Sequence, residues 1–186
     1  QKAVKWNSPF YGVEGQGWFL ATHVFKNFVR ITWFQGQALK PIPPGPSKDK
    51  NARYLLVATG TGVTPYRAML PLIPKLHAGR GCTFELIYGA RTEAELLYGD
   101  EFAEFARTTP GFRFHSCFSR QPRAVPREGD IHGRVQVALA ALKPDPANDI
   151  AYLCGNPDMV DETFNLLKEI GLPVPQVRRE KYISSR

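Results

Sequence analysis

The sequence lacks any long apolar run. No stretch approaches the roughly 20 residues that a membrane-spanning helix needs, so no membrane span is expected. The chain is also poor in cysteine, with three in 186 residues, and Cys82, Cys117 and Cys154 have neither metal-ligand spacing nor the pattern of a disulfide framework. We therefore expect no metal site. Unpaired thiols are typical of a reducing compartment, which predicts a cytoplasmic protein.

Long runs of like charge are missing as well. The chain has 24 basic and 17 acidic residues, a net charge of +7, but the basic residues are scattered and form no run beyond Arg178-Arg179. This pattern does not indicate a nucleic-acid-binding protein. It permits an acidic partner or an anionic ligand.

The chain divides by composition near residues 41–51, PIPPGPSKDKN, which are rich in proline and typical of a linker. Residues 1–50 contain strand-like pieces, WFLATHVF and FVRITWF, and are interpreted as a partial β segment. Residues 51–186 are interpreted as a second, nucleotide-binding domain.

The second part alternates short apolar runs with helical patterns. Strands are predicted at 53–59, 82–90, 112–118, 149–155 and 176–182, and helices at 64–77, 93–107 (with an interruption at Gly99), 133–142 and 157–171. This alternation predicts an α/β fold, a doubly wound five-stranded parallel sheet covered on both faces. Ligands of such sheets bind beyond the carboxyl ends of the strands, so functional residues should follow strands directly.

The stretch after the first strand is GTGVTP, residues 60–65. Its members are Gly60, Thr61, Gly62, Val63, Thr64 and Pro65. The two glycines can adopt positive φ and leave room for a ligand against the main chain. Thr64 is predicted as the N-cap and Pro65 as the first residue of the following helix, which would turn free N–H groups toward a pyrophosphate. The alternative is a tight turn without a ligand.

Basic residues follow the next two predicted strands. Arg91 stands where an NAD-binding Rossmann domain normally carries an acidic residue for the ribose hydroxyls, and it could face a phosphate or be a surface arginine. Ser119 and Arg120 follow the third strand, and a hydroxyl beside a guanidinium suits a phosphate monoester such as the 2′-phosphate of NADP. Arg123, Arg127 and Arg134 come next, in what is expected to be a loop of low order. A solvated basic loop is the alternative.

The fourth strand ends in CGNPDM, residues 154–159. Asn156 can cap and Pro157 can begin the next helix, so the pattern of the first turn recurs. Cys154 has no evident base nearby. We interpret it as a packing thiol, or one in contact with a nicotinamide, rather than as a nucleophile.

Taken together, five motifs resemble the nicotinamide-binding half of the ferredoxin–NADP reductase superfamily. They are GTGVTPYRAML, YGARTEAELLYGDEF, the Ser119-Arg120 pair, CGNPDMV and REKY, and they span residues 53 to 182 in family order. The resemblance implies that residues 60–65 bind the pyrophosphate and nicotinamide side of NADP(H). It assigns Ser119, Arg120 and Arg134 to the 2′-phosphate. It assigns Cys154 and Glu180, with Gly155, Asn156 and Met159 nearby, to the nicotinamide side, and Tyr182 to the flavin ring.

The family resemblance further implies a reductase in which hydride passes between nicotinamide and FAD, and electrons then pass singly to ferredoxin or flavodoxin. The basic balance would favour an acidic carrier. The front part departs from the family because fifty residues are too few for its flavin-binding barrel, and the Arg-x-Tyr-Ser/Thr motif is missing. Three alternatives stay open: an NADH-dependent reductase component of an oxygenase, a nucleotide-binding module without turnover, and a plain interaction domain without nucleotide affinity.

Overall fold

The computed structural model describes residues 2–5, 8–13, 17–24, 29–33 and 51–182. The backbone groups into two units, Gln1–Lys48 and Asp49–Arg186, which are described separately below. Most of the predicted linker, residues 41–50, lies outside the described residues.

The first unit contains an antiparallel sheet of four strands in the order β1-β2-β3-β4. These strands are β1 (Lys2–Lys5), β2 (Ser8–Val13), β3 (Gly17–Val24) and β4 (Val29–Trp33). Each strand pairs with its neighbour along the chain, with a register shift between Tyr11 and Gly12. The strand-like pieces in the front part are thus strands, while their interpretation as part of a flavin-binding barrel stays a prediction.

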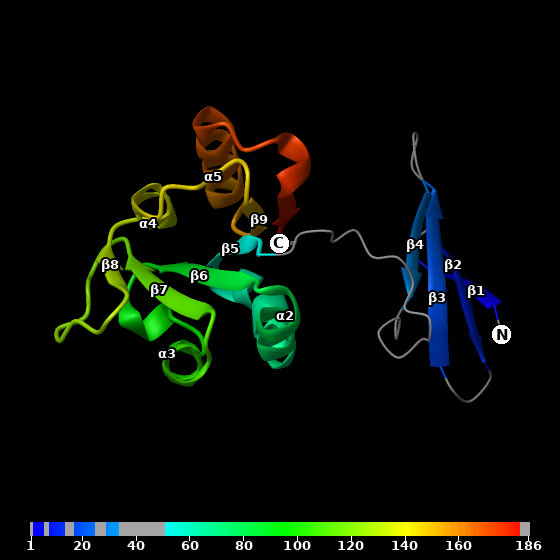
Figure 1. Cartoon of the computed structure of the whole chain (residues 1–186), viewed down its shortest axis with the longest axis horizontal. Helices are drawn as coiled ribbons and strands as arrows, with labels where there is room; N and C mark the ends of the chain where they lie inside the picture. Colours follow the sequence, from blue (N-terminus) through cyan, green and yellow to red (C-terminus); the bar gives the residue numbers. More distant parts are fainter. Residues whose placement is uncertain (1, 6–7, 14–16, 25–28, 34–50, 183–186) are drawn as a thin grey trace. The chain divides into compact units, whose positions relative to one another are not determined.

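The second unit is built on a parallel sheet of six strands in the order β10-β9-β5-β6-β7-β8 (Figure 1). The strands are β5 (Arg53–Thr59), β6 (Thr83–Ala90), β7 (Phe112–Phe118), β8 (Asp130–His132), β9 (Asp149–Gly155) and β10 (Val177–Lys181). The five predicted strands are confirmed, and their apolar runs are buried because helices cover both faces. The sequence missed β8, a three-residue edge strand with a single apolar residue, Ile131.

Helices cover the two faces of this sheet in separate groups. On one face, α4 (Val135–Ala141) and α5 (Pro157–Ile170) enclose a core with Leu55, Ile87 and Leu153. On the other face, α1 (Thr64–Met69), α2 (Ile73–Arg80) and α3 (Gly99–Thr108) enclose a second core rich in aromatic residues. Figure 1 shows α4 and α5 on one side of the sheet and α2 and α3 on the other. The doubly wound α/β prediction is confirmed.

Two predicted helices are divided into shorter pieces. The helix predicted over 64–77 is divided into α1, a 3₁₀ turn η3 (Leu70–Leu72) and α2, since Pro71 and Pro74 lack the N–H groups that a continuous helix needs. The helix predicted over 93–107 is interrupted as expected: a short 3₁₀ turn, η4 (Glu93–Glu95), precedes α3, which begins at Gly99 after the left-handed Tyr98.

The order of the strands determines where a ligand can bind. From β5 the chain adds β6, β7 and β8 on one side, and then crosses to place β9 and β10 on the other side. The connections therefore diverge between β5 and β9, which opens a crevice at the carboxyl ends of these strands. The segments predicted to bind the nucleotide follow β5, β6, β7 and β9, so they meet along this edge.

Candidate nucleotide-binding site

The turn after β5 is a 3₁₀ helix, η2 (Gly60–Val63). Gly60 has a φ of +55°, as predicted, but Gly62 is not among the residues with positive φ. Thr64 is not an N-cap: it lies inside α1, and its Oγ1 donates a hydrogen bond of 2.8 Å to the carbonyl oxygen of Thr61. The prediction was wrong because the helical turn already starts at Gly60, four residues earlier. No side chain caps the start of η2.

Gly62 has a different role from the predicted one. A Cβ atom at this position would lie within 2.3 Å of the carbonyl oxygen of Cys154 and within 2.6 Å of Cα of Gly155. The turn after β5 therefore packs directly against the backbone at the end of β9. The two turns are also joined by a hydrogen bond of 3.1 Å from the N–H of Asn156 to Oγ1 of Thr59.

The start of α5 is capped as the sequence predicts. The side-chain oxygen of Asn156 accepts hydrogen bonds from the N–H groups of Asp158 (2.9 Å) and Met159 (3.3 Å), and Pro157 is in the first turn. Asn156 therefore satisfies these two N–H groups, whereas no side chain caps the start of η2.

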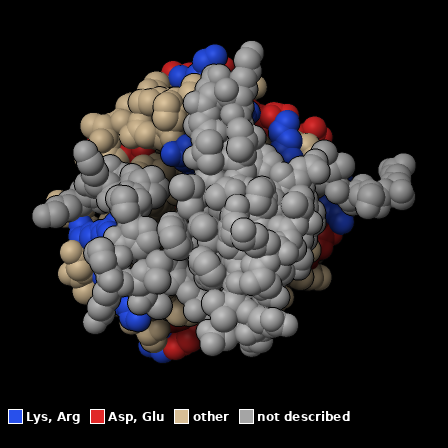
Figure 2. Space-filling view, turned by 90° about the vertical axis from the view of Figure 1, so that its right-hand side faces the viewer, with Lys and Arg blue, Asp and Glu red and all other residues tan. Residues whose placement is uncertain are grey.

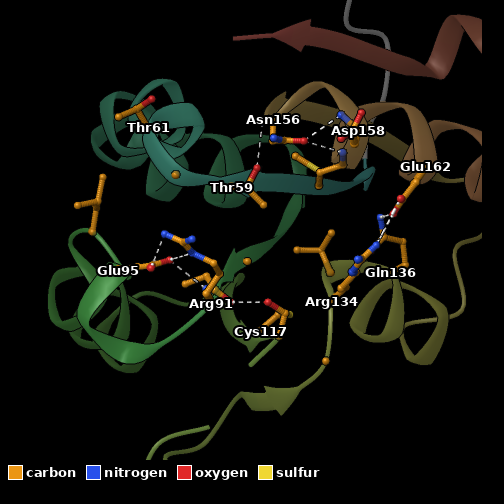
Figure 3. Close-up of a pocket in the computed structure, with 18 residues that line it drawn as sticks. Thr59, Thr61, Arg91, Glu95, Cys117, Arg134, Gln136, Asn156, Asp158 and Glu162 are labelled. Carbon is orange, nitrogen blue, oxygen red and sulfur yellow. Dashed lines mark hydrogen bonds and ion pairs between the residues drawn. The ribbon is translucent and has the colours of Figure 1, made fainter. Parts of the chain in front are cut away.

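Between these turns and the ends of β6 and β7 lies a cavity of about 660 Å³, referred to below as the carboxyl-edge cavity. Figure 3 shows it between Thr59, Thr61 and Asn156 on one side and Arg91, Cys117 and Arg134 on the other. Of the residues predicted from sequence, it brings together Gly60, Thr61, Arg91, Ser119, Arg134, Asn156 and Met159. Gly62, Val63, Thr64, Pro65, Arg120, Cys154, Gly155, Glu180 and Tyr182 are not part of its lining.

Arg91 lies at the tip of β6 and is engaged by a neighbouring carboxylate. Its Nε donates to Oε2 of Glu95 at 2.8 Å, and its Nη2 lies 2.7 Å from Oε1 of the same residue. This hydrogen-bonded pair holds the pKa of Glu95 below its usual range. Both side chains line the carboxyl-edge cavity and face each other in Figure 3.

Ser119 and Arg120 follow β7 at the same edge. The hydroxyl of Ser119 donates to the carbonyl oxygen of Ala90 at 3.4 Å, and the N–H of Arg120 donates to the carbonyl oxygen of Arg91 at 3.1 Å. The Arg120 side chain is exposed and forms no hydrogen bond or ion pair with any residue that the structure describes. It is therefore available to an anion.

Arg134 precedes α4 and forms an ion pair of 3.2 Å with Glu162 on α5. Gln136 also donates to Glu162, at 3.3 Å, and all three side chains line the cavity and lie together in Figure 3. The predicted phosphate-binding arginine is thus paired with a carboxylate in this structure, as Arg91 is.

Two arginines in the loop before β8 form ion pairs. Arg123 is 6% exposed at its side chain, pairs with Glu93 and, at 3.0 Å, with Asp130, and lies over the ring of Phe118. Arg127 pairs with Asp100 at 2.5 Å. Residues 119–129 form no helix or strand, and these ion pairs connect them to Glu93, Asp100 and Asp130; the low order of the loop stays a prediction.

A second hollow, of about 630 Å³, lies at the junction of the two turns and the end of β10. It shares Thr59, Gly60, Thr61 and Asn156 with the carboxyl-edge cavity and adds Gly155, Lys181 and Tyr182. The two cavities therefore adjoin at these four shared residues.

Next to residues of this hollow in the chain are Cys154 and Glu180, predicted for the nicotinamide side, while Tyr182, predicted for the flavin ring, lines the hollow itself. Glu180 is the register partner of Cys154 in the β9–β10 pair, and the N–H of Tyr182 donates to the carbonyl oxygen of Gly155 at 2.9 Å. The Cys154 thiol is buried, which raises its pKa; a hydrogen bond with Tyr182 opposes that shift, and the charge of Glu180 adds to it. Cys154 is therefore a neutral thiol at pH 7, which agrees with its interpretation as a packing residue.

Within residues 51–182 and the described strands of the first unit, no cluster of three or more His, Cys, Asp or Glu could hold a metal ion. Over the same residues, no helix has the length and apolar character required to cross a bilayer. On the face shown in Figure 2, the parts that are not grey carry basic side chains next to acidic ones at the upper, right and lower rims. The positive net charge is thus not gathered into one patch along these rims.

Comparison with known proteins identifies the family. A family model described as the oxidoreductase NAD-binding domain matches residues 56–164, more than half of the chain. The chain belongs to this family. The match begins within β5 and ends within α5, so it includes both turns and the residues that line the carboxyl-edge cavity. It confirms the resemblance to the NAD(P)-binding half of ferredoxin–NADP reductases.

Individual relatives carry several names. The chain is 35% identical over 147 residues to ferredoxin–NADP reductase B of Sorangium cellulosum, covering 76% of this chain and 56% of the relative. It is 32% identical to the reductase component of propane 2-monooxygenase of Rhodococcus jostii, covering 70% and 35%. A ferredoxin–NADP⁺ reductase structure from Neisseria gonorrhoeae with bound FAD and NADP matches with a TM-score of 0.58 and 25% identity, covering 72% and 57%. The chain therefore spans about half of these proteins, or less.

Several cavity residues were missed by sequence reasoning. They are Thr59, Gly89, Glu95, Leu97, Gln136, Asp158 and Glu162. A signal existed for some of them: Glu95 is four residues after Arg91, and Asp158 and Glu162 share one face of a helix that starts at the ligand edge. The search for phosphate-binding residues looked for basic and hydroxyl side chains, so it passed over the carboxylates.

Proposed function

We propose that this chain is the NADP(H)-binding part of a flavin-dependent reductase that exchanges electrons with ferredoxin or flavodoxin. The observation that carries the proposal is the carboxyl-edge cavity, formed by the glycine-containing turn after β5 and the basic and hydroxyl residues after β6 and β7. Its size and its position at the divergence point of the sheet suit a dinucleotide. Membership of the NAD-binding family supports the same ligand.

The turn after β5 is the proposed pyrophosphate site. No side chain caps its start, and a Cβ atom added to Gly60 would meet nothing within 4 Å, so a ligand can approach the backbone closely. Ser119 and Arg120 are the proposed 2′-phosphate site. Arg120 supports this assignment because its guanidinium has no partner among the described residues.

The second hollow is the proposed nicotinamide side. When bound, NADPH supplies a hydride from its nicotinamide ring, and by family resemblance FAD accepts it. Gly155 would form part of the wall against the ring, and Cys154, a buried neutral thiol, precedes it in β9. Glu180 would place a carboxylate next to it, and Tyr182, 37% exposed, would cover the site from the end of β10. The FAD and NADP in the gonococcal reductase structure support this pairing of cofactors.

An acidic electron-carrier protein is the proposed partner. The net charge of +7 favours encounter with an acidic protein, and the Sorangium relative is named for ferredoxin.

One observation favours a second candidate, an NADH-dependent reductase component of an oxygenase. Three carboxylates, Glu95, Asp158 and Glu162, line the carboxyl-edge cavity beside only two arginines. Acidic residues suit ribose hydroxyls better than a 2′-phosphate. The Rhodococcus relative, the reductase component of a monooxygenase, supports this candidate.

The test is a calorimetric titration of the chain with NADP⁺ and NAD⁺, together with an absorbance spectrum. Under the first proposal NADP⁺ binds more tightly, and Arg120→Ala weakens NADP⁺ about 10- to 100-fold while NAD⁺ changes little, because a charge-assisted contact to the 2′-phosphate is lost. A flavin band in the spectrum argues for a working reductase. Preference for NADP⁺ without flavin argues for a nucleotide-binding module.

Arg107→Ala is the matched control. Arg107 is an exposed arginine on α3 that pairs with Glu104 and does not line the carboxyl-edge cavity. Its removal lowers the net charge equally and should leave both affinities unchanged. Equal weakening of NADP⁺ and NAD⁺ by Arg120→Ala would contradict the 2′-phosphate assignment, and tighter NAD⁺ binding by the parent chain would favour the oxygenase candidate.

A further inference from the structure

We infer that Glu95 determines nucleotide specificity in this chain: its carboxylate occupies Arg91 and weakens the preference for a 2′-phosphate, so that the chain binds both NADP(H) and NAD(H). This inference rests on the proposed function and concerns the selectivity of the same site. It assigns a role to a residue that lies within the motif YGARTEAELLYGDEF but was not among the site residues predicted from the sequence.

The geometry of the pair is the first support. Glu95 is four residues after Arg91, and its two oxygens contact Nε at 2.8 Å and Nη2 at 2.7 Å. One full edge of the guanidinium is thus used, and this is the edge that would otherwise bind a phosphate with two parallel hydrogen bonds. The Glu95 carboxylate also accepts weakly from the N–H of Arg91, at 3.4 Å, which holds it at the tip of β6.

The position of Glu95 within the electrostatic field of both arginines is the second support. The pKa of Glu95 is lowered mainly by its hydrogen bond to Arg91, with a smaller contribution from the charge of Arg120. Glu95 is therefore ionised at neutral pH, and its charge interacts with that of Arg91 and with that of Arg120 at the proposed 2′-phosphate site. A phosphate that arrives there must displace the carboxylate or bind against its repulsion.

The charge balance of the whole cavity is the third support. Its lining includes two arginines and three acidic residues, Arg91 and Arg134 against Glu95, Asp158 and Glu162, which gives a net charge of −1. Both arginines pair with carboxylates that also line the cavity. An NADP site built only for the 2′-phosphate would have an excess of positive charge. This balance is expected of a site that tolerates the uncharged 2′-hydroxyl.

The experiment compares NADP⁺ and NAD⁺ affinities of the parent chain and of Glu95→Gln by calorimetry. The substitution keeps the size and polarity of the side chain, removes its charge and frees Arg91. We expect NADP⁺ to bind about five- to tenfold more tightly and NAD⁺ to change less than twofold. Glu101→Gln is the matched control, because Glu101 is equally exposed, pairs with Arg67 and does not line the cavity. It should alter neither affinity.

A double-mutant cycle with Arg91→Gln gives a sharper readout. In the parent chain Arg91 is already occupied, so Arg91→Gln should change NADP⁺ affinity less than about twofold. In the Glu95→Gln background the same substitution should remove the whole gain, about five- to tenfold. A merely structural role of the pair would weaken both nucleotides together and would not produce this dependence.

Three outcomes overturn the inference. Equal effects of Arg91→Gln in both backgrounds would show that Glu95 does not control Arg91. Unchanged NADP⁺ affinity in Glu95→Gln would show that the negative charge of Glu95 does not affect binding of the 2′-phosphate. Weakened NAD⁺ binding in Glu95→Gln would show that the carboxylate binds the ribose hydroxyls instead. Failure of the proposed function itself is distinct, because the parent chain would then bind neither nucleotide.

Discussion

The turns after β5 and β9 look alike in sequence and differ in the structure. Each contains glycine, and each leads into a helix with proline in its first turn. The turn after β9 is closed: Asn156 caps α5 and satisfies two of its N–H groups. The turn after β5 has no side-chain cap at its start. The difference indicates which of the two turns can offer its backbone to a ligand.

The two turns also depend on each other. A side chain on Gly62 would meet the backbone of Cys154 and Gly155, and a side chain on Gly155 would meet the backbone and hydroxyl of Thr59. Each glycine is therefore required by the other turn rather than by a ligand. Gly60 is the exception, because its surroundings are open. The comparison separates glycines that hold the two turns together from a glycine that leaves space.

The largest expected effect is that of Gly62→Ala. Its Cβ would lie 2.3 Å from the carbonyl oxygen of Cys154, a backbone atom that cannot move without shifting the end of β9. We expect the free energy of unfolding to fall by about 3 kcal/mol or more, measured by denaturant titration. Gly79→Ala, in α2 with nothing within 4 Å, is the control and should stabilise by about 0.5–1 kcal/mol. A Gly62→Ala chain as stable as the parent would contradict the contact between the turns.

This contact marks the limit of what the sequence could reveal. The strands, the doubly wound arrangement and the cap at Asn156 could be predicted because each depends on local residue patterns. The packing of Gly62 against Cys154 joins segments that are 92 positions apart, and no local pattern encodes it. The same holds for Arg123, which looked like a loop arginine until its partners Glu93 and Asp130 were known.

In the site, sequence reasoning found the turn after β5 and the basic residues, but it missed the carboxylates that pair with two of these basic residues. Arg134 was predicted as a phosphate ligand and Arg91 as either a phosphate ligand or a surface arginine, yet Glu162 and Glu95 pair with them. The strand β8 was missed for a similar reason: three residues with one apolar side chain are too short for a periodic signal, and the strand exists because it pairs with β7.

A smaller effect is expected for Gly60→Ala, which tests the turn after β5, the one without a side-chain cap. The residue has a φ of +55°, where a Cβ is unfavourable, but the added atom meets nothing within 4 Å. We expect a loss of about 1–2 kcal/mol in the free energy of unfolding from the backbone alone. Because the methyl group points into open space at the proposed pyrophosphate site, NADP⁺ affinity in calorimetry should fall as well. Unchanged affinity would argue against a close approach of the ligand at Gly60.

The smallest effect is expected for Asn156→Ala, which makes the closed turn resemble the open one. The substitution frees the N–H groups of Asp158 and Met159 and should lower the free energy of unfolding by about 1 kcal/mol. Asn156→Ser keeps a capping oxygen and should stay within a few tenths of a kcal/mol of the parent. Thermal unfolding of the three chains in parallel measures the difference. If the alanine and serine variants are equally stable, the cap does not stabilise α5. The turns after β5 and β9 would then differ in their hydrogen bonds, but the cap at Asn156 would contribute nothing to the free energy of unfolding.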